Sequence, residues 1–121
     1  MAAKQPRQHD KKHLDFIRSL PCLICHDNTG TEATHIRMSD ARHNKVNPGV
    51  GAKPDDKYTL PLCNLHHREQ HAIGDERKFW DGIGLDPIPL ALELYKVSGD
   101  HEKGCEIIQR AGQTLSIWAA G

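Results

Sequence analysis

Apolar and polar positions alternate along the chain with two different periods, and these periods predict where helices and strands lie. The apolar residues of segment 10–20 recur at helical spacing, so the sequence predicts a first helix there. Runs of β-favouring residues at 31–37 and 58–62 predict the two strands of a hairpin. Pro61 fits an edge position or a strand end. The intervening segment 38–56 lacks apolar periodicity and is rich in Gly, Pro, Asn and Asp, which predicts a long surface loop.

Four more helices are predicted after the hairpin, over 64–72, 75–80, 86–98 and 101–111. Three of the predicted helices begin at an aspartate that can serve as N-cap: Asp10, Asp75 and Asp86. Pro21 ends the first helix, and glycines end the one that begins at 75. The order of the elements predicts an α+β fold in which helices flank one hairpin.

The amino-acid composition predicts that the apolar core is small. Only 37% of the 121 residues are hydrophobic and only 5% are aromatic, so a metal crosslink would help such a chain to fold. Sixteen basic and sixteen acidic side chains give no net charge, which excludes a general polyanion binder. The N-terminal residues contain no apolar signal segment and no run could cross a bilayer. We therefore expect a cytoplasmic protein with reduced cysteines and no membrane partner.

The cysteines supply the metal ligands. Two residues separate Cys22 from Cys25, and two residues separate Cys63 from His66. Each spacing matches the bite of a tetrahedral ion, and together they predict one structural zinc site. The alternative is that these cysteines are buried without a ligand. Cys105 stands apart from both pairs, and we expect it in the core.

Two further histidines, His67 and His71, are more than this zinc site can use. They are four residues apart in a predicted helix, so their side chains lie on one face and could share a second ion. A shift of one residue in this assignment would exchange the roles of His66 and His67. Only the assignment of His66 to zinc gives each of these candidate ligands a role, because it leaves His67 to pair with His71. We expect the remaining histidines, apart from His35, at the surface: His9, His13, His26, His43 and His101. Phe79 and Trp80 are expected to pack beneath the helix of the imidazole pair, which we define as His67 and His71.

Several of these motifs resemble the HNH nucleases, whose core is a ββα-metal finger. The similar segments are Ala33-Thr34-His35-Ile36-Arg37, Lys53-Pro54-Asp55-Asp56-Lys57 and the run from Leu60 to His71 with its Cys63-x2-His66-His67-x3-His71 spacing. The likeness is greatest to phage recombination-enhancement nucleases and related prophage HNH proteins, and it covers about residues 20–82. It implies the zinc-bound finger at 20–82 and does not extend clearly over the helical annex at 83–121. The chain length predicts a single domain over 1–121, and the polar sequence of 1–9 predicts a disordered segment there.

The resemblance also implies roles for individual residues. His35 would be the general base, and His67 and His71 would hold a catalytic Mg²⁺ or Mn²⁺. This agrees with the chemistry of phosphodiester hydrolysis, which needs a base near neutral pKa and a cation to offset developing charge. The mechanism requires His35 to converge with the imidazole pair on one solvent-open pocket. Four basic residues are candidates for contacts with the nucleic-acid backbone: Arg37, Arg68, Lys53 and Lys57.

Two positions depart from the family pattern. The family often has an acidic residue or histidine just before the base, and this chain has Thr34. The asparagine that orients the base falls at Tyr58, with Asp56 nearby as a substitute. The resemblance thus implies an HNH-type endonuclease that cleaves DNA to 5′-phosphate and 3′-hydroxyl ends, with a recombinase or another phage or host DNA-processing protein as a further candidate partner. The alternative is an inactive zinc-stabilised module that binds nucleic acid or protein.

Overall fold

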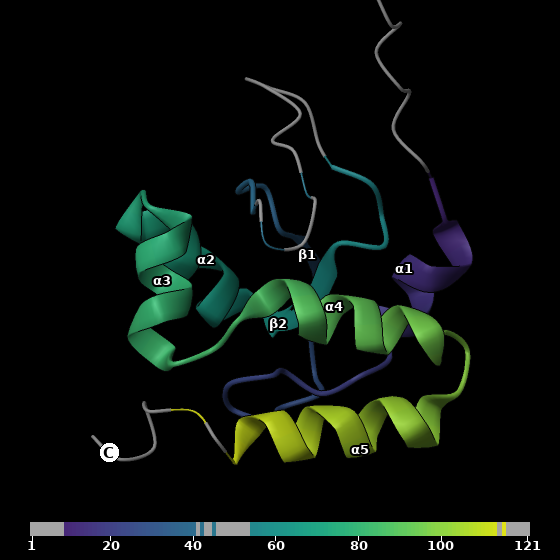
Figure 1. The fold of residues 1–121 in the computed structure, drawn as a ribbon. Coiled ribbons are helices and arrows are strands. Elements are labelled where there is room, and N and C mark those ends of the chain that lie inside the picture. The colour runs from purple at the N-terminus through teal and green to yellow at the C-terminus, as the bar shows by residue number, and fades with distance from the viewer. Residues whose placement is uncertain (1–8, 41, 43–44, 46–53, 114, 116–121) are drawn as a thin grey trace, which may run out of the picture.

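The computed structural model describes residues 9–40, 42, 45, 54–113 and 115. Within these residues the chain forms an α+β fold of one two-stranded sheet and five helices (Figure 1). The elements in chain order are α1 (Lys11–Arg18), β1 (Thr31–His35), β2 (Thr59–Cys63), α2 (Asn64–Ile73), α3 (Glu76–Ile83), α4 (Pro87–Lys96) and α5 (His101–Gly112). The predicted α+β class and the predicted order of the elements are confirmed. None of the described helices is both long and apolar enough to span a membrane.

The hairpin is antiparallel, with Thr31 opposite Cys63 and His35 opposite Thr59. β1 ends at His35, two residues before the predicted end at position 37. The reason is that the backbone N–H groups of Arg37 and Met38 donate to the Glu76 carboxylate, at 2.9 and 3.0 Å, and leave the strand ladder. The structure thus anchors the end of β1 to the first turn of α3.

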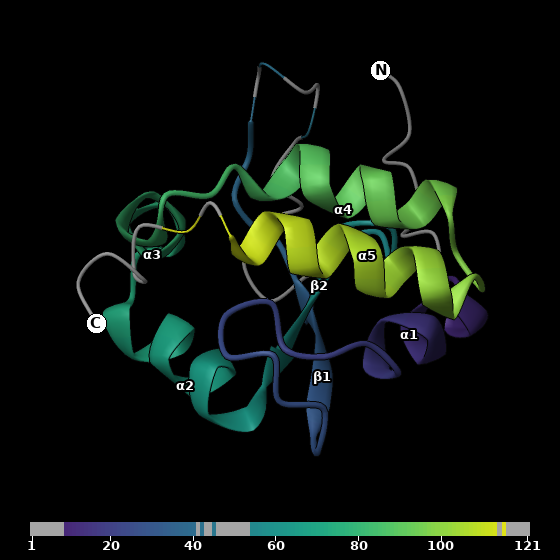
Figure 2. The same cartoon turned by 90° about the horizontal axis from the view of Figure 1, so that it is seen from below.

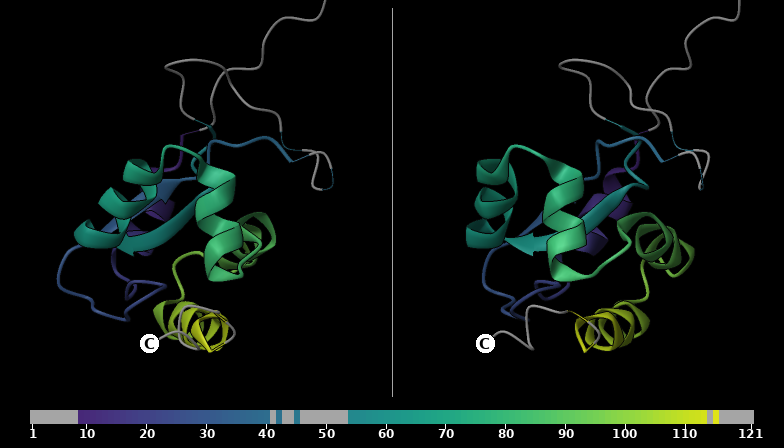
Figure 3. Two further views of the ribbon diagram at one scale, coloured as in Figure 1. Left: turned by 90° about the vertical axis from the view of Figure 1, so that its left-hand side faces the viewer. Right: turned by 60° about the vertical axis from the view of Figure 1, so that its left-hand side comes forward.

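The helices surround the hairpin. Figures 1 and 2 show α2 and α3 at one end of the molecule and α1 at the other, with α4 and α5 side by side. Figure 3 shows α2 and α3 next to the hairpin, with α4 and α5 below them. Phe79 and Trp80 are buried in the core, as predicted, at 4% and 0% exposure. Cys105 is half-buried and packs against the core rather than within it.

Helix boundaries follow the capping residues in the sequence. Asp10 caps α1 by accepting the backbone N–H of His13, and Asp75 caps α3 in the same way through Lys78. Gly84 ends α3 in the left-handed conformation, with φ of 77°, which glycine adopts without a steric penalty. α5 approaches α1 closely at Gly104, where a Cβ would lie 2.8 Å from the Phe16 ring of α1 and 2.8 Å from the Leu20 side chain just after it. Any larger residue at this position would require the Leu20 and Phe16 side chains to shift.

Some residues of the predicted surface loop are buried, which corrects that expectation. Asp40, Lys45 and Asp56 are 4%, 3% and 1% exposed. Lys45 donates through Nζ to the backbone carbonyl of Met38 at 2.7 Å, and Asp40 and Lys45 pair through their backbones. A polar residue can be buried at little cost in free energy when it has a hydrogen-bond partner, as each of these residues has. The periodicity of apolar residues does not reveal such partners.

His13 is buried, so the prediction that it lies at the surface is wrong. Its Nδ1 is 2.8 Å from Ser98 Oγ, and its ring packs edge-on against Tyr95. Nε2 is buried and has no hydrogen-bond partner among the described residues. Burial lowers the pKa of His13, and the nearby carboxylates of Asp10 and Asp56 only partly oppose this effect. His9, His26 and His101 are exposed, as predicted, whereas His43 lies outside the described residues.

The buried imidazole of His13 predicts acid sensitivity. Because its pKa in the folded protein is below the unfolded value of 6.5, the unfolded chain binds more protons as pH falls. The contribution of His13 is therefore fully present above the unfolded pKa and is lost as pH falls through the folded pKa. We expect the free energy of unfolding of the wild-type protein to fall more steeply below pH ~6.5 than that of His13→Asn. Chemical denaturation of both proteins across this range checks the difference, and parallel curves would contradict it. The comparison cancels acid effects on other groups.

Candidate functional site

The first metal-ligand pair lies in a tight turn after α1. The backbone N–H of His26 donates to the Cys22 carbonyl at 2.8 Å, and that of Ile24 approaches Cys22 Sγ at 3.4 Å. His26 closes the turn in the left-handed conformation, with φ of 63°. Leu23 donates its backbone N–H to the Pro61 carbonyl of β2 at 2.9 Å. The turn is thereby fixed against the strand that leads to the second pair.

The second pair completes one cluster. Cys63 ends β2 and His66 lies in the first turn of α2, so the strand-to-helix junction sets their separation. The ligand atoms of Cys22, Cys25, Cys63 and His66, the Cys₃His cluster, all lie within 4.8 Å of one another. These four residues could therefore hold a metal ion.

The distances within the Cys₃His cluster fit tetrahedral zinc. Zn–S bonds of about 2.3 Å and Zn–N bonds of about 2.0–2.1 Å imply S–S and S–N separations of about 3.8 and about 3.6 Å. The Sγ atoms of Cys25 and Cys63 are 3.8 Å apart, and Cys22 Sγ is 3.6 Å from His66 Nδ1. The Cys63 Sγ to His66 Nδ1 distance is shorter, at 3.1 Å. The donor set and its spacing agree with the expected structural zinc.

The Cys25 thiol of this cluster is difficult to ionise without a cation. Burial raises the pKa of Cys25 to about 11, and the neighbouring Cys22 and Cys63 sulfurs add to the rise. Although Cys25 is exposed as a residue, its Sγ lies among the other three ligand atoms. Zinc binds thiolates, so its binding would release protons from these cysteines.

The imidazole pair forms a second group of ligand atoms on α2. His67 Nε2 and His71 Nε2 are 3.1 Å apart. For metal–nitrogen bonds of about 2.0–2.1 Å, two nitrogens on one ion are about 2.9 Å apart in an octahedral shell and about 3.4 Å in a tetrahedral one. The observed spacing lies between these values, so both atoms could bind one ion.

Glu32 of β1 contacts His67 on the ring nitrogen that does not face His71. Its Oε1 is 2.6 Å from His67 Nδ1, and its Oε2 accepts from Asn64 Nδ2 at 3.3 Å. Hydrogen bonds from His67 and Asn64 lower the pKa of Glu32, so its carboxylate is ionised near neutral pH. This is the carboxylate–histidine arrangement that often lies behind a metal-binding imidazole.

His35 has a carboxylate partner of its own. His35 Nε2 is 2.9 Å from Asp56 Oδ1, and Asp56 Oδ2 accepts the backbone N–H of Asp10 at 2.7 Å. The hydroxyl of Thr59 donates to the Asp56 carbonyl. One buried aspartate thus joins β1, β2 and the N-terminus of α1. Thr34 is buried, and its side chain does not line the pocket of the imidazoles.

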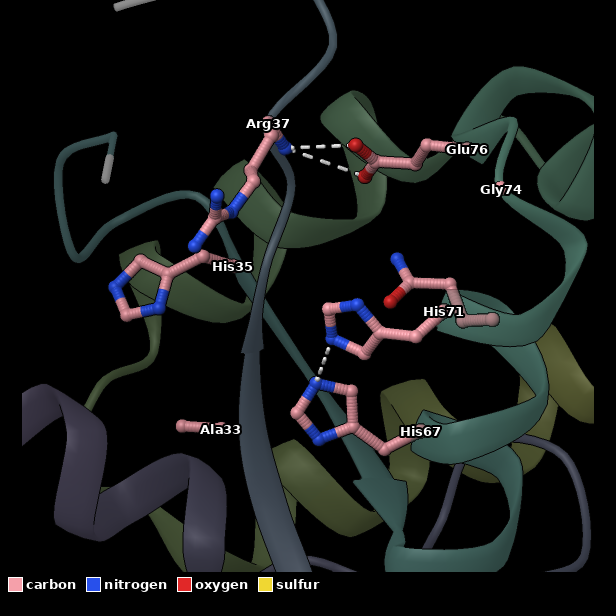
Figure 4. Close-up of a pocket in the computed structure, with 8 residues that line it drawn as sticks. Ala33, His35, Arg37, His67, His71, Gly74 and Glu76 are labelled. Atoms are coloured by element: carbon pink, nitrogen blue, oxygen red, sulfur yellow. Dashed lines mark hydrogen bonds between the residues drawn. The ribbon is translucent and has the colours of Figure 1, made fainter. Parts of the chain in front are cut away.

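One pocket of about 480 Å³ includes all three imidazoles in its lining, together with Ala33, Arg37, Gln70, Gly74 and Glu76. Figure 4 shows the His67 and His71 rings together on the α2 side of β1. His35 lies across the β1 ribbon from them, with its ring turned away from the imidazole pair (Figure 4). Alternation along the strand explains this, because Glu32, which contacts His67, is three residues before His35 and faces the opposite side.

A family model described as a protein of unknown function, DUF968, matches residues 1–91 of the 121. The chain belongs to the DUF968 family. No curated protein and no solved structure matches it. The DUF968 match includes the Cys₃His cluster, the hairpin and the imidazole pair, whereas α5 lies beyond it.

The basic residues expected at the nucleic-acid backbone occupy different places in this DUF968 protein. Arg37 is exposed and lines the pocket of the imidazoles. Arg68 is exposed on α2, and Lys57 packs over the Tyr58 ring, but neither lines that pocket. Lys53 lies outside the described residues.

The sequence did not identify Glu32 or Glu76 as site residues. It indicated Asp56 only as a substitute for the asparagine that is absent at Tyr58. Glu32 lies in the same strand as His35, but nothing in its spacing indicates a contact with a helix more than thirty residues later. Glu76 accepts from two backbone N–H groups and from Trp80 Nε1, so its role at the pocket is to hold the end of β1. The signal for Asp56 was its place near the expected asparagine.

Proposed function

We propose that this protein is an HNH-type endonuclease that hydrolyses DNA phosphodiester bonds. In this proposal β1, β2 and α2 form the ββα-metal finger, the Cys₃His cluster holds a structural zinc, and His67 and His71 hold a divalent ion. The observation that carries the proposal is one pocket bordered by three imidazoles, two of which have a carboxylate on one ring nitrogen and keep the other ring nitrogen for the proposed chemistry.

His35 is the proposed general base. If its Nε2–H donates to Asp56, the lone pair remains on Nδ1, which can take a proton from water. The Asp56 carboxylate then stabilises the imidazolium that forms. Asp56 would thereby replace the asparagine that is absent at Tyr58.

The imidazole pair is the proposed site of the second ion. A divalent ion there would offset the charge that develops on the phosphate and the leaving oxygen. Imidazole nitrogen suits transition metals, whereas Mg²⁺ prefers oxygen ligands. Of the two candidate ions, Mn²⁺ therefore fits this donor pair better than Mg²⁺. Arg37 at the rim is the proposed contact for a backbone phosphate.

The alternative, a zinc-stabilised binding module without catalysis, has observations in its favour. His35 is turned away from the imidazole pair, and the Cys₃His cluster is the only group of three or more metal-ligand side chains found in the described part of the chain. The two functions share the zinc and differ in whether DNA is cut.

A nicking assay decides between them. The zinc-loaded protein is incubated with supercoiled plasmid and Mn²⁺, and a parallel gel-shift assay measures DNA binding. We expect conversion to nicked circles with Mn²⁺, less with Mg²⁺ and none with a chelator of the added ion. DNA binding without cutting under all these conditions would refute the endonuclease and favour the binding module.

A further inference from the structure

We propose that Glu32 is a positioning residue that fixes the tautomer of His67, so that His67 presents the lone pair of Nε2 beside Nε2 of His71. The meaning of this inference for catalysis rests on the proposed function. Its structural claim rests only on contacts between β1 and α2.

The contact with Glu32 decides which nitrogen of the His67 ring is protonated. A carboxylate can only accept hydrogen bonds, so the short contact of 2.6 Å requires a proton on His67 Nδ1. A neutral imidazole has only one protonated nitrogen, so Nε2 then has the lone pair. Without an ion, the His71 Nε2–H can donate to that lone pair across 3.1 Å. With an ion, the same lone pair is the ligand.

The contact between Glu32 and His67 contributes little to folding stability. The side chains of Glu32 and His67 are 43% and 25% exposed, so water screens their attraction and the ion pair adds little to folding stability. Its main effect is on ring orientation and tautomer. Residues that orient a metal-binding histidine in this way commonly change metal affinity by about 10- to 100-fold.

A purely structural role is the competing explanation. Glu32 also accepts from Asn64 Nδ2 at 3.3 Å, which links β1 to the first residue of α2. If this link were the purpose of Glu32, removing Asn64 would have the same effect as removing Glu32. Asn64→Ala is therefore the matched control, and Glu69→Gln tests the same loss of charge at an exposed site on α2.

The test has one readout that needs no second ion. Long-range proton–nitrogen NMR of the zinc-loaded protein reports which nitrogen of His67 has the proton. We expect Nδ1–H in the wild-type protein and in both controls. Glu32→Ala should shift His67 towards Nε2–H, and Glu32→Gln, which retains an acceptor oxygen, should shift it less.

The second readout is Mn²⁺ affinity, measured by the loss of the free-ion signal in electron paramagnetic resonance. Glu32→Ala should weaken binding by about 10- to 100-fold, with both controls at the wild-type value. The inference is overturned if Glu32→Ala keeps the Nδ1–H tautomer, or if Asn64→Ala reproduces its effects. If Glu32→Ala changes the tautomer but the wild-type protein cuts no DNA, the inference stands and the endonuclease proposal fails.

Discussion

Replacing His35 by alanine is expected to remove Mn²⁺-dependent nicking of supercoiled DNA while the protein stays folded and zinc-loaded. A positioned general base typically contributes about 10²- to 10⁴-fold to a rate, which would leave no detectable product in a plasmid assay. His35 is not part of the Cys₃His cluster, so zinc content should not change. The measurement is the initial rate of nicking at fixed Mn²⁺, with zinc content and melting temperature determined on the same samples.

Two companion variants separate loss of the base from loss of structure. His35→Gln can place an amide N–H near the position of Nε2 and so retain a donor to Asp56, but it has no basic nitrogen. It should be as inactive as His35→Ala and at least as stable. Asp56→Asn tests the orienting partner and should reduce the rate by a smaller factor.

A control histidine is also available. His101 is exposed at the start of α5 and its ring contacts Ser19 and Cys105, away from the pocket. His101→Ala should cut DNA at the wild-type rate. Wild-type nicking by His35→Ala would show that another group acts as the base, or that the cutting comes from a contaminant.

The elements that the sequence predicted well are those whose information is local. Helical spacing and an aspartate cap predicted α1, and ligand pairs separated by two residues predicted the Cys₃His cluster, because both depend on neighbours along the chain. The imidazole pair was predicted for the same reason. Each of these features could be found without knowing which segments meet in space.

The contacts that the sequence could not predict join distant segments. The Asp56 carboxylate meets Asp10 and His35, which are 46 and 21 residues away, and Glu32 meets His67 35 residues away. His13 was wrongly expected at the surface because a histidine shows no apolar period, whereas its burial depends on Ser98 and Tyr95. Composition identifies polar residues, but only packing decides which of them are buried.

Replacing Cys63 by serine is expected to remove the zinc and unfold the domain. Structural zinc sites contribute on the order of 10 kcal/mol of apparent folding free energy, which is comparable to the whole stability of a small domain. The change also has an opposing local effect. Cys63 is the N-cap of α2 and makes no side-chain capping bond, and serine at this position could add one that contributes about 1 kcal/mol. Loss of the metal is the larger effect, so we expect net unfolding, measured by circular dichroism and zinc content.

Cobalt substitution tests the cluster in the folded wild-type protein. Three thiolates on Co²⁺ give a strong sulfur-to-metal absorption, which we expect when Co²⁺ replaces zinc in the wild-type protein. Cys25→Ser should weaken that band because one of the three sulfurs is lost, and Cys105→Ser should leave it unchanged because Cys105 lies outside the cluster. A Cys63→Ser protein that keeps one zinc and the wild-type melting temperature would contradict the prediction. In that case Cys63 would not be an essential ligand, and Cys22, Cys25 and His66 would hold the zinc without it.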